Sequence, residues 1–124
     1  MKISEILKKK ATISFEVFPP KNKEGDISSI YYTIEELSQL NPDFISVTYG
    51  AGGSTKGKTV EIASTIKNQY NIEAVAHLTC ISSTESEILD ICQQLKDNHM
   101  ENILSLPPQA QQAARWWSST TKPA

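Results

Sequence analysis

Apolar and polar residues alternate in the segment Thr12–Phe18, which is the pattern of a half-buried β-strand. Pro19-Pro20 would end this strand, because proline has no N–H to donate to a sheet. One face of the strand would carry Ile13, Phe15 and Val17, and the other face Ser14, Glu16 and Phe18. The pattern therefore predicts a carboxylate near the end of the first strand, on the face opposite the aliphatic residues.

Three further strands are expected, over Asp43–Thr48, Ile72–Thr79 and Asn102–Leu106. In the first of them, Phe44, Ile45 and Val47 are the β-branched and aromatic residues that suit a pleated, buried surface. The predicted strands begin near residues 12, 43, 72 and 101, so that successive starts lie 31, 29 and 29 residues apart. This spacing is typical of successive β-α units, although the units do not repeat one another in sequence.

Helical periodicity fills the segments around these strands. We expect a first helix over Ile3–Lys10, a second after the N-cap residue Asp26, a third after the glycines that follow Tyr49, and a fourth after the capping box Thr84-x-x-Glu87. The apolar stripes of the last three helices are Ile27, Ile30, Tyr31, Ile34 and Leu37; Thr59, Ile62, Ala63, Ile66 and Tyr70; and Ile88, Ile91, Cys92 and Leu95.

This alternation predicts an α/β fold of parallel strands with right-handed crossovers. An open doubly wound sheet and the first half of a (β/α)8 TIM barrel both fit. Glu16, Thr48 and His77 share one strand parity and lie at the C-terminal ends of their strands, where a barrel forms its active site. This favours the barrel, of which 124 residues would supply only about half, since a complete one needs about 250 residues.

Composition narrows the class of protein. With 39% hydrophobic and 21% charged residues, the chain is expected to be globular. A net charge of −2 and the lack of a basic face argue against nucleic acid as a partner. No apolar run approaches the roughly 20 residues that cross a bilayer, and the N-terminus lacks the apolar core of a signal peptide. We therefore expect a cytoplasmic protein that does not enter a membrane.

Residues 107–124 differ from the preceding chain, because they contain no acidic residue and show no periodicity. We therefore expect one domain over residues 1–106, followed by a disordered or unrelated tail. The tail contains Trp116-Trp117, which could alternatively anchor a partner.

The glycine turn after the second strand contains a Walker A pattern, Gly52-x-x-x-x-Gly57-Lys58-Thr59. In a P-loop, backbone N–H groups cradle phosphates, the lysine binds the outer phosphates and the threonine holds Mg²⁺. No later strand ends in the aspartate that a Walker B strand supplies, and Lys56 and Lys58 could equally be surface charges of a helix. A nucleotide-binding P-loop module is therefore the alternative interpretation.

His77, Cys80, Cys92 and His99 offer zinc-ligand chemistry, but their spacing is irregular and Cys92 belongs to an apolar helix stripe. We expect Cys92 to be a small hydrophobic residue and predict no metal site. The two cysteines do not form a disulfide framework.

Glu16 is the most informative single residue. Phe15, Val17 and Phe18 flank its carboxyl group, and apolar surroundings favour the protonated form that a general acid needs near neutral pH. An exposed or salt-bridged strand glutamate fits the pattern equally well.

Four motifs together resemble methylenetetrahydrofolate reductase, in order and over the chain as far as Leu104. They are SFEVFPP (Ser14–Pro20), DFISVTYGAGGS (Asp43–Ser54), TVEIA (Thr59–Ala63) and AHLTC (Ala76–Cys80). The resemblance implies a (β/α)8 barrel with FAD at its C-terminal mouth. It also implies hydride transfer from NADH or NADPH through FAD to the folate substrate 5,10-methylenetetrahydrofolate, which becomes 5-methyltetrahydrofolate.

The resemblance also assigns roles to residues that match the motifs. Glu16 would be the general acid that protonates the folate and opens its five-membered ring to an iminium. Thr48 would contact the nicotinamide cofactor and the flavin region, and Tyr49, Ala51 and His77 would contact FAD.

The chain departs from the family after the fourth strand, where the family continues into Leu-Arg-Gly-Asp and this chain continues from Ser105-Leu106 into Pro107-Pro108. A deletion, a frameshift or a gene fragment would each explain the difference. A half-barrel would leave strand edges unpaired, so we expect self-association and weak or absent activity. A non-catalytic interaction fragment is the third interpretation.

Overall fold

The computed structural model describes residues 1–20, 28–49, 56–80 and 83–106, in which strands and helices alternate. The N-cap candidate Asp26, the glycine turn and the tail from residue 107 lie outside these ranges. The elements are α1 (Ile3–Lys9), β1 (Ser14–Val17), α2 (Ser28–Ser38), β2 (Phe44–Val47), α3 (Lys56–Asn68), β3 (Glu73–Thr79), α4 (Glu85–Asp97) and β4 (Ile103–Leu106).

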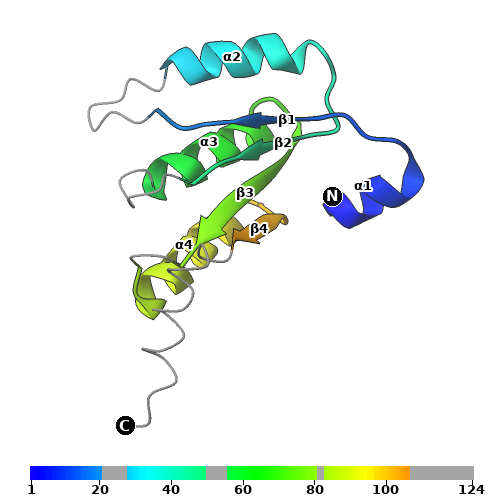
Figure 1. The fold of residues 1–124 in the computed structure, drawn as a ribbon. Coiled ribbons are helices and arrows are strands. Elements are labelled where there is room, and N and C mark those ends of the chain that lie inside the picture. Colours follow the sequence, from blue (N-terminus) through cyan, green and yellow to red (C-terminus); the bar gives the residue numbers. More distant parts are fainter. Residues whose placement is uncertain (21–27, 50–55, 81–82, 107–124) are drawn as a thin grey trace, which may run out of the picture.

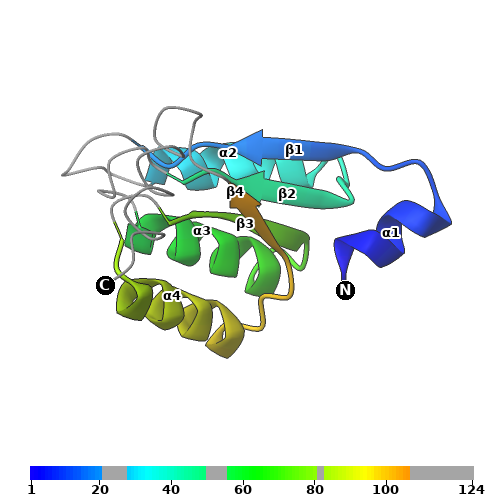
Figure 2. The ribbon, with the colours of Figure 1, turned by 60° about the horizontal axis from the view of Figure 1, so that its bottom comes forward.

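The four strands form one parallel sheet in the order β1-β2-β3-β4, which confirms the prediction of parallel neighbours in chain order (Figure 1). The helices α2, α3 and α4 lie side by side along one face of this sheet, and α1 lies beyond the N-terminal ends of the strands (Figure 2). A doubly wound sheet would carry helices on both faces. The arrangement is instead that of the first half of a (β/α)8 barrel, as expected.

The core lies between the sheet and these three helices. Val17, Val47 and Ala76 occupy one row across the sheet, and all three are buried against the helices. The helices contribute their predicted stripes, of which the fully or nearly fully buried members are Ile30, Ile34, Thr59, Ile62, Ala63, Ile66, Ile91 and Leu95. Burial of each large aliphatic side chain contributes about 1.5–3 kcal/mol, so this face dominates the stability of the unit.

Local capping fixes where the helices begin and end. The Thr84 hydroxyl accepts a hydrogen bond of 3.1 Å from the backbone N–H of Glu87, which confirms the predicted N-cap of α4. Beyond the same helix, His99 has a left-handed φ of 64°, and the N–H of Met100 reaches back to the carbonyl of Leu95 at 3.0 Å. This is a Schellman closure at a position where glycine is usual.

The short helix α1 is held against the last strand. The buried side chain of Asn102 accepts a hydrogen bond from the N–H of Ile3 at 2.9 Å and donates one to the carbonyl of Met1 at 3.0 Å. The Asn102 amide thus satisfies one of the N–H groups that every helix leaves unpaired at its N-terminus. The first helix is therefore fastened to the sheet at the N-terminal ends of its strands.

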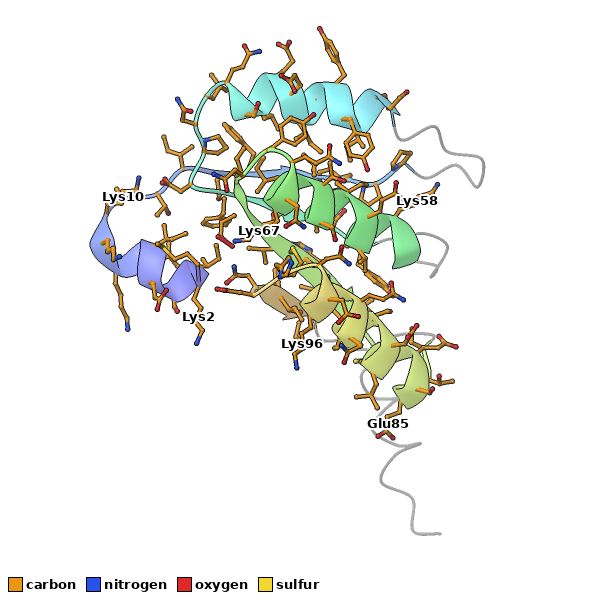
Figure 3. The ribbon with its side chains drawn as sticks, turned by 180° about the vertical axis from the view of Figure 1, so that it is seen from behind. Lys2, Lys10, Lys58, Lys67, Glu85 and Lys96 are labelled. Atoms are coloured by element: carbon orange, nitrogen blue, oxygen red, sulfur yellow. The ribbon has the colours of Figure 1, made fainter. Side chains whose placement is uncertain are left out.

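Charged pairs surround these N-terminal strand ends, where Figure 3 labels Lys10 and Lys67. The Lys10 ammonium lies 2.6 Å from Asp43, and the Lys67 ammonium lies 2.6 Å from Glu73, whose side chain is 11% exposed. Burial by itself would raise the pKa of Glu73, but hydrogen bonds from Lys67 and the terminal amine bring it below its usual value. The same pairing raises the pKa of Lys67.

In the described part of the chain, no helix is both long enough and apolar enough to cross a bilayer.

Candidate functional site

The face of the sheet opposite the helices carries the predicted site residues. Glu16 pairs in register with Ser46 of β2, which pairs with Val75 of β3, two residues before His77. Since side chains alternate along a strand, Glu16, Ser46 and His77 project from the same face of the sheet. Thr48 lies two residues after Ser46, just beyond β2, and has the same parity. The predicted shared parity of Glu16, Thr48 and His77 is thus confirmed.

Two neighbouring strands supply polar contacts to the carboxylate of Glu16. The Ser46 hydroxyl donates a hydrogen bond of 3.2 Å to Oε1 of Glu16. The Nε2 atom of His77 lies 3.2 Å from the same oxygen, at ion-pair distance but without hydrogen-bond alignment. This contact is an ion pair only when the imidazole is protonated.

The two partners differ in their access to solvent. The side chain of Glu16 is 46% exposed, whereas that of His77 is only 9% exposed. Of the two interpretations of Glu16 left open by the sequence, the described structure therefore shows an exposed carboxylate with polar neighbours. A group in this position can exchange protons with a bound molecule.

A cavity of about 500 Å³ lies beside this carboxylate on the open face. Its apolar lining includes Phe44, Val75 and Leu104, and Lys2 and Glu101 contribute charged groups to the lining. A hollow of this size, in which apolar surface from residues such as Phe44 and Val75 stands beside the polar groups of Glu16, Ser46 and His77, can accommodate a small molecule.

The strand ends beside Glu16 carry the remaining candidate contacts. Thr48 and Tyr49 are half-buried residues that follow β2, and Ala51 lies outside the described residues. The carbonyl of Thr48 accepts a hydrogen bond of 2.9 Å from the hydroxyl of Thr59, which is only 1% exposed. In the P-loop interpretation this hydroxyl would hold Mg²⁺, whereas here it joins α3 to the end of β2.

The zinc candidates do not come together. Among the residues that the structure describes, no group of three or more His, Cys, Asp or Glu side chains could hold a metal ion. Cys92 packs against the core as a small hydrophobic residue, as predicted, and Cys80 is an exposed free thiol.

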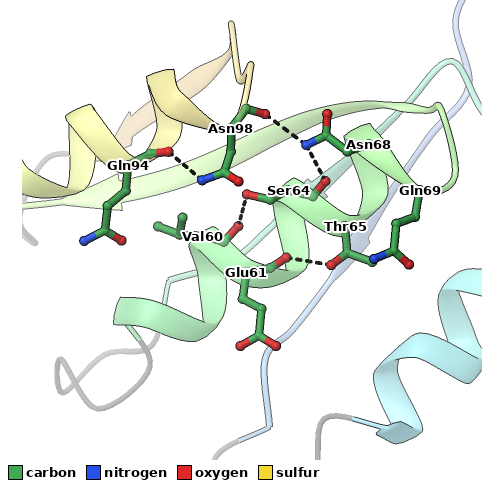
Figure 4. A pocket seen from close by; sticks show the side chains of 8 residues that line it. All are labelled: Val60, Glu61, Ser64, Thr65, Asn68, Gln69, Gln94 and Asn98. Carbon is green, nitrogen blue, oxygen red and sulfur yellow. Dashed lines mark hydrogen bonds between the residues drawn. The ribbon is translucent and has the colours of Figure 1, made fainter.

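A second hollow, of about 390 Å³, lies between α3 and α4 on the helical side (Figure 4). Its lining is almost entirely polar, but several of its groups are used within the helices. The Asn68 amide donates to the carbonyls of Ser64 and Asn98, and the Asn98 amide donates to the carbonyl of Gln94. The bond from Asn68 to Asn98 joins α3 to the end of α4 and the other two lie within the helices, so the groove has a structural explanation.

A family model described as methylenetetrahydrofolate reductase matches residues 2–123. The chain belongs to the methylenetetrahydrofolate reductase family. The match extends into residues 107–124, whose separate status stays a prediction.

Curated relatives agree with this assignment. The chain is 36% identical over 105 residues to a rice protein named "Probable methylenetetrahydrofolate reductase (NADH)". It is 38% identical over 94 residues to the 5,10-methylenetetrahydrofolate reductase of Escherichia coli strain K12. These alignments cover 82% and 76% of this chain, but only 18% of the rice protein and 31% of the bacterial one. The chain thus spans less than a third of the length of either relative.

Ser46 is a site residue that the sequence analysis missed. Ser46 lies within the motif DFISVTYGAGGS, but the resemblance gave it no role and a serine inside an apolar strand shows no distinctive periodicity. Its parity, which equals that of Thr48 two positions later, could have placed it on the open face. Only the strand register places it directly beside Glu16.

Proposed function

We propose that this chain supplies the Glu16 side of a flavin-dependent site that reduces 5,10-methylenetetrahydrofolate to 5-methyltetrahydrofolate, with NADH or NADPH as the hydride source. The observation that carries the proposal is the partly exposed Glu16 carboxylate on the open face, beside Ser46 and His77 and next to an apolar cavity. Membership of the reductase family supplies the substrate class.

In this proposal Glu16 delivers a proton to a nitrogen of the folate. The protonated nitrogen leaves the bridging carbon, the five-membered ring opens, and the resulting iminium accepts a hydride at that carbon. The carboxyl group must start in its protonated form and ends as the carboxylate. The partial exposure of the Glu16 side chain allows it to recover a proton from solvent.

The residues at the strand ends offer the polar and apolar groups that could bind a flavin. Bound FAD would accept the hydride from the nicotinamide and pass it to the folate. Thr48 and His77 offer polar groups at the ends of β2 and β3, and the His77 Nε2 atom is buried without a hydrogen-bond partner among the described residues. Phe44, Val75 and Leu104 provide apolar surface nearby. Tyr49 and Ala51 complete the proposed FAD contacts, and Thr48 would also approach the nicotinamide.

The name of the rice relative specifies NADH. This supports NADH as the first donor to test, with NADPH as the alternative.

The decisive experiment separates the two half-reactions under single-turnover conditions, with the chain in excess and saturated with FAD. Glu16→Gln should slow the folate half-reaction by about 10²–10⁴-fold, the usual contribution of a general acid. Reduction of the flavin by NADH should stay within about twofold, because that step needs no proton from Glu16. Glu36→Gln, an exposed carboxylate on α2 that does not line this cavity, is the matched control and should change neither step. Equal rates of folate reduction in the wild type and Glu16→Gln would end the assignment.

The P-loop alternative predicts a different ligand. Titration with FAD and with Mg-ATP discriminates between the two functions, and we expect FAD alone to bind. Tight ATP binding that is lost in Lys58→Ala would replace the reductase proposal.

A further inference from the structure

We propose that Ser46 is a positioning residue for Glu16, holding its carboxylate in one orientation from the neighbouring strand. This inference rests on the proposed function, in which Glu16 is the proton donor, and it assigns a role to Ser46, which lies within the motif DFISVTYGAGGS but has been given no role there.

The geometry behind the proposal is set by the strand register. Glu16 and Ser46 are direct partners across β1 and β2, so their side chains emerge next to each other on the same face. The Ser46 hydroxyl donates to Oε1 at 3.2 Å. The next residue in the same row is Val75, which cannot form a hydrogen bond. Within this row of paired residues, Ser46 therefore supplies the hydroxyl group next to Glu16.

A glutamate in this environment needs such a contact. Its side chain has three rotatable bonds, and with 46% of it exposed, packing alone does not select one rotamer. His77 also approaches Oε1, but without the alignment of a hydrogen bond. The directional contact on the carboxylate therefore comes from Ser46.

The contact also distinguishes the two carboxylate oxygens. Within the described residues, the polar contacts of Glu16 both end on Oε1. An oxygen that accepts a hydrogen bond from Ser46 is a poor position for the acidic proton, so the proton to be delivered resides on Oε2. Ser46 thus decides which oxygen of Glu16 acts, and small misplacements of a reacting group cost as much as about a hundredfold in rate.

NMR couplings on the intact 124-residue chain test this without reference to activity. In the wild type, couplings from Cγ of Glu16 to its backbone N and C′ should report a single χ1 rotamer. Ser46→Ala should shift them to averaged, intermediate values. Ser46→Thr keeps the hydroxyl on a residue that suits strands and should restore the wild-type values. Ser105→Ala, a serine on the exposed strand β4, is the control and should have no effect.

The kinetic arm uses the single-turnover assay. Ser46→Ala should slow folate reduction about tenfold to a hundredfold while flavin reduction by NADH stays unchanged, and Ser46→Thr should recover most of the loss. Wild-type couplings in a folded Ser46→Ala variant would overturn the inference, because His77 or packing would then hold Glu16 in its rotamer without Ser46. Full folate reduction by Glu16→Gln would instead remove the proposed function and leave the rotamer result intact, so the two failures are distinguishable.

Discussion

The Oε1 atom of Glu16 lies 3.2 Å from Nε2 of His77, although strand β2 lies between their strands. The two side chains meet beside Ser46, whose hydroxyl donates a hydrogen bond to the same oxygen. Three consecutive parallel strands therefore contribute one polar group each to a single point on the open face. In barrels, the C-terminal ends of parallel strands bring side chains together in this way, and here the strands alone form the candidate site.

Catalysis by the 124-residue chain alone should be slow. A flavin bound by the residues of one face loses as much conformational and rotational entropy as in a complete pocket, but it gains fewer contacts. Hydride transfer also needs rigid alignment of both reactants. We expect FAD to be lost during gel filtration and steady-state NADH oxidation by catalytic amounts of the chain to stay near background, so that the two half-reactions are measurable only in single turnovers with the chain in excess and saturated with FAD. A monomer that keeps its yellow flavin through the column and turns over methylenetetrahydrofolate would contradict this.

The ion pair of Glu73 should make the fold sensitive to acid. The folded-state pKa of Glu73 is lowered, so its contribution to stability is complete above the ordinary glutamate pKa of about 4.3 and is lost as the pH falls through the lowered value. Glu73→Gln should cost about 1–3 kcal/mol in unfolding free energy at pH 7 and flatten the loss of stability below pH 5. Urea unfolding at pH 7, 5, 4 and 3 measures both effects.

The remaining acid sensitivity has its own source. Hydrogen bonds from the Lys10 side chain and the Ile13 backbone lower the pKa of Asp43. The Glu73→Gln variant should therefore still lose some unfolding free energy as the pH falls. Glu36→Gln, an exposed carboxylate on α2, is the matched control. If the unfolding free energies of the wild type and Glu73→Gln changed equally with pH, the Glu73 ion pair would not contribute to the acid sensitivity. Lys67 acts at the alkaline end, because its raised pKa means that its contribution is lost only as the pH rises through that value.

The Asn102 side chain should govern the attachment of α1. Asn102→Ala removes both hydrogen bonds to the first residues of the chain and should cost about 1–3 kcal/mol. Amide exchange over residues 3–9, followed by mass spectrometry, should accelerate in this variant while exchange in β2 and β3 changes little. Asn102→Asp keeps the acceptor for the Ile3 N–H but loses the donor, and should give an intermediate rate. Unchanged exchange in Asn102→Ala would mean that packing alone holds the helix.

Replacing His99 by glycine should stabilise the protein. His99 is exposed and adopts a φ of 64°, a conformation that strains any residue with a Cβ atom. His99→Gly should relieve this strain and, after the entropy that glycine adds to the unfolded chain, increase stability by about 0.5–1 kcal/mol. His99→Ala keeps the Cβ atom and should give no gain. Thermal unfolding of the three proteins checks the order, and a lower midpoint for His99→Gly would contradict it.

Self-association should occur through the edges of the described sheet. The strand β4 exposes Ile103, Leu104 and Leu106 by 44%, 45% and 37%, and it is an edge of the sheet. Leu104→Lys places a charge where another strand would dock and should shift the chain towards monomer in sedimentation velocity. Leu40→Lys, at an exposed position after α2, should not change the distribution. A monomeric wild-type chain at high concentration would refute edge pairing.

The sequence by itself determined the order of the elements and the faces of the strands. Periods of two and of 3.6 residues are local properties, and they correctly predicted the parallel strands, most of the described members of the three helical stripes, and the common face of Glu16, Thr48 and His77. Ile27, also assigned to a stripe, lies outside the described residues. Boundaries were less accurate, since the expected strand Thr12–Phe18 pairs only over Ser14–Val17. Tyr70, assigned to the third helical stripe, lies beyond the end of α3 at Asn68.

The tertiary structure alone decided which residues touch. The pairing of Glu16 with Ser46 depends on the register between β1 and β2, and a shift by one residue would turn the partner side chain to the other face. The fastening of α1 by Asn102 joins residues from opposite ends of the described chain, so no local pattern could reveal it. Such contacts are set by the packing of the whole sheet, because the free energy that fixes the register comes from burying the helix-facing row and not from the polar groups on the open face.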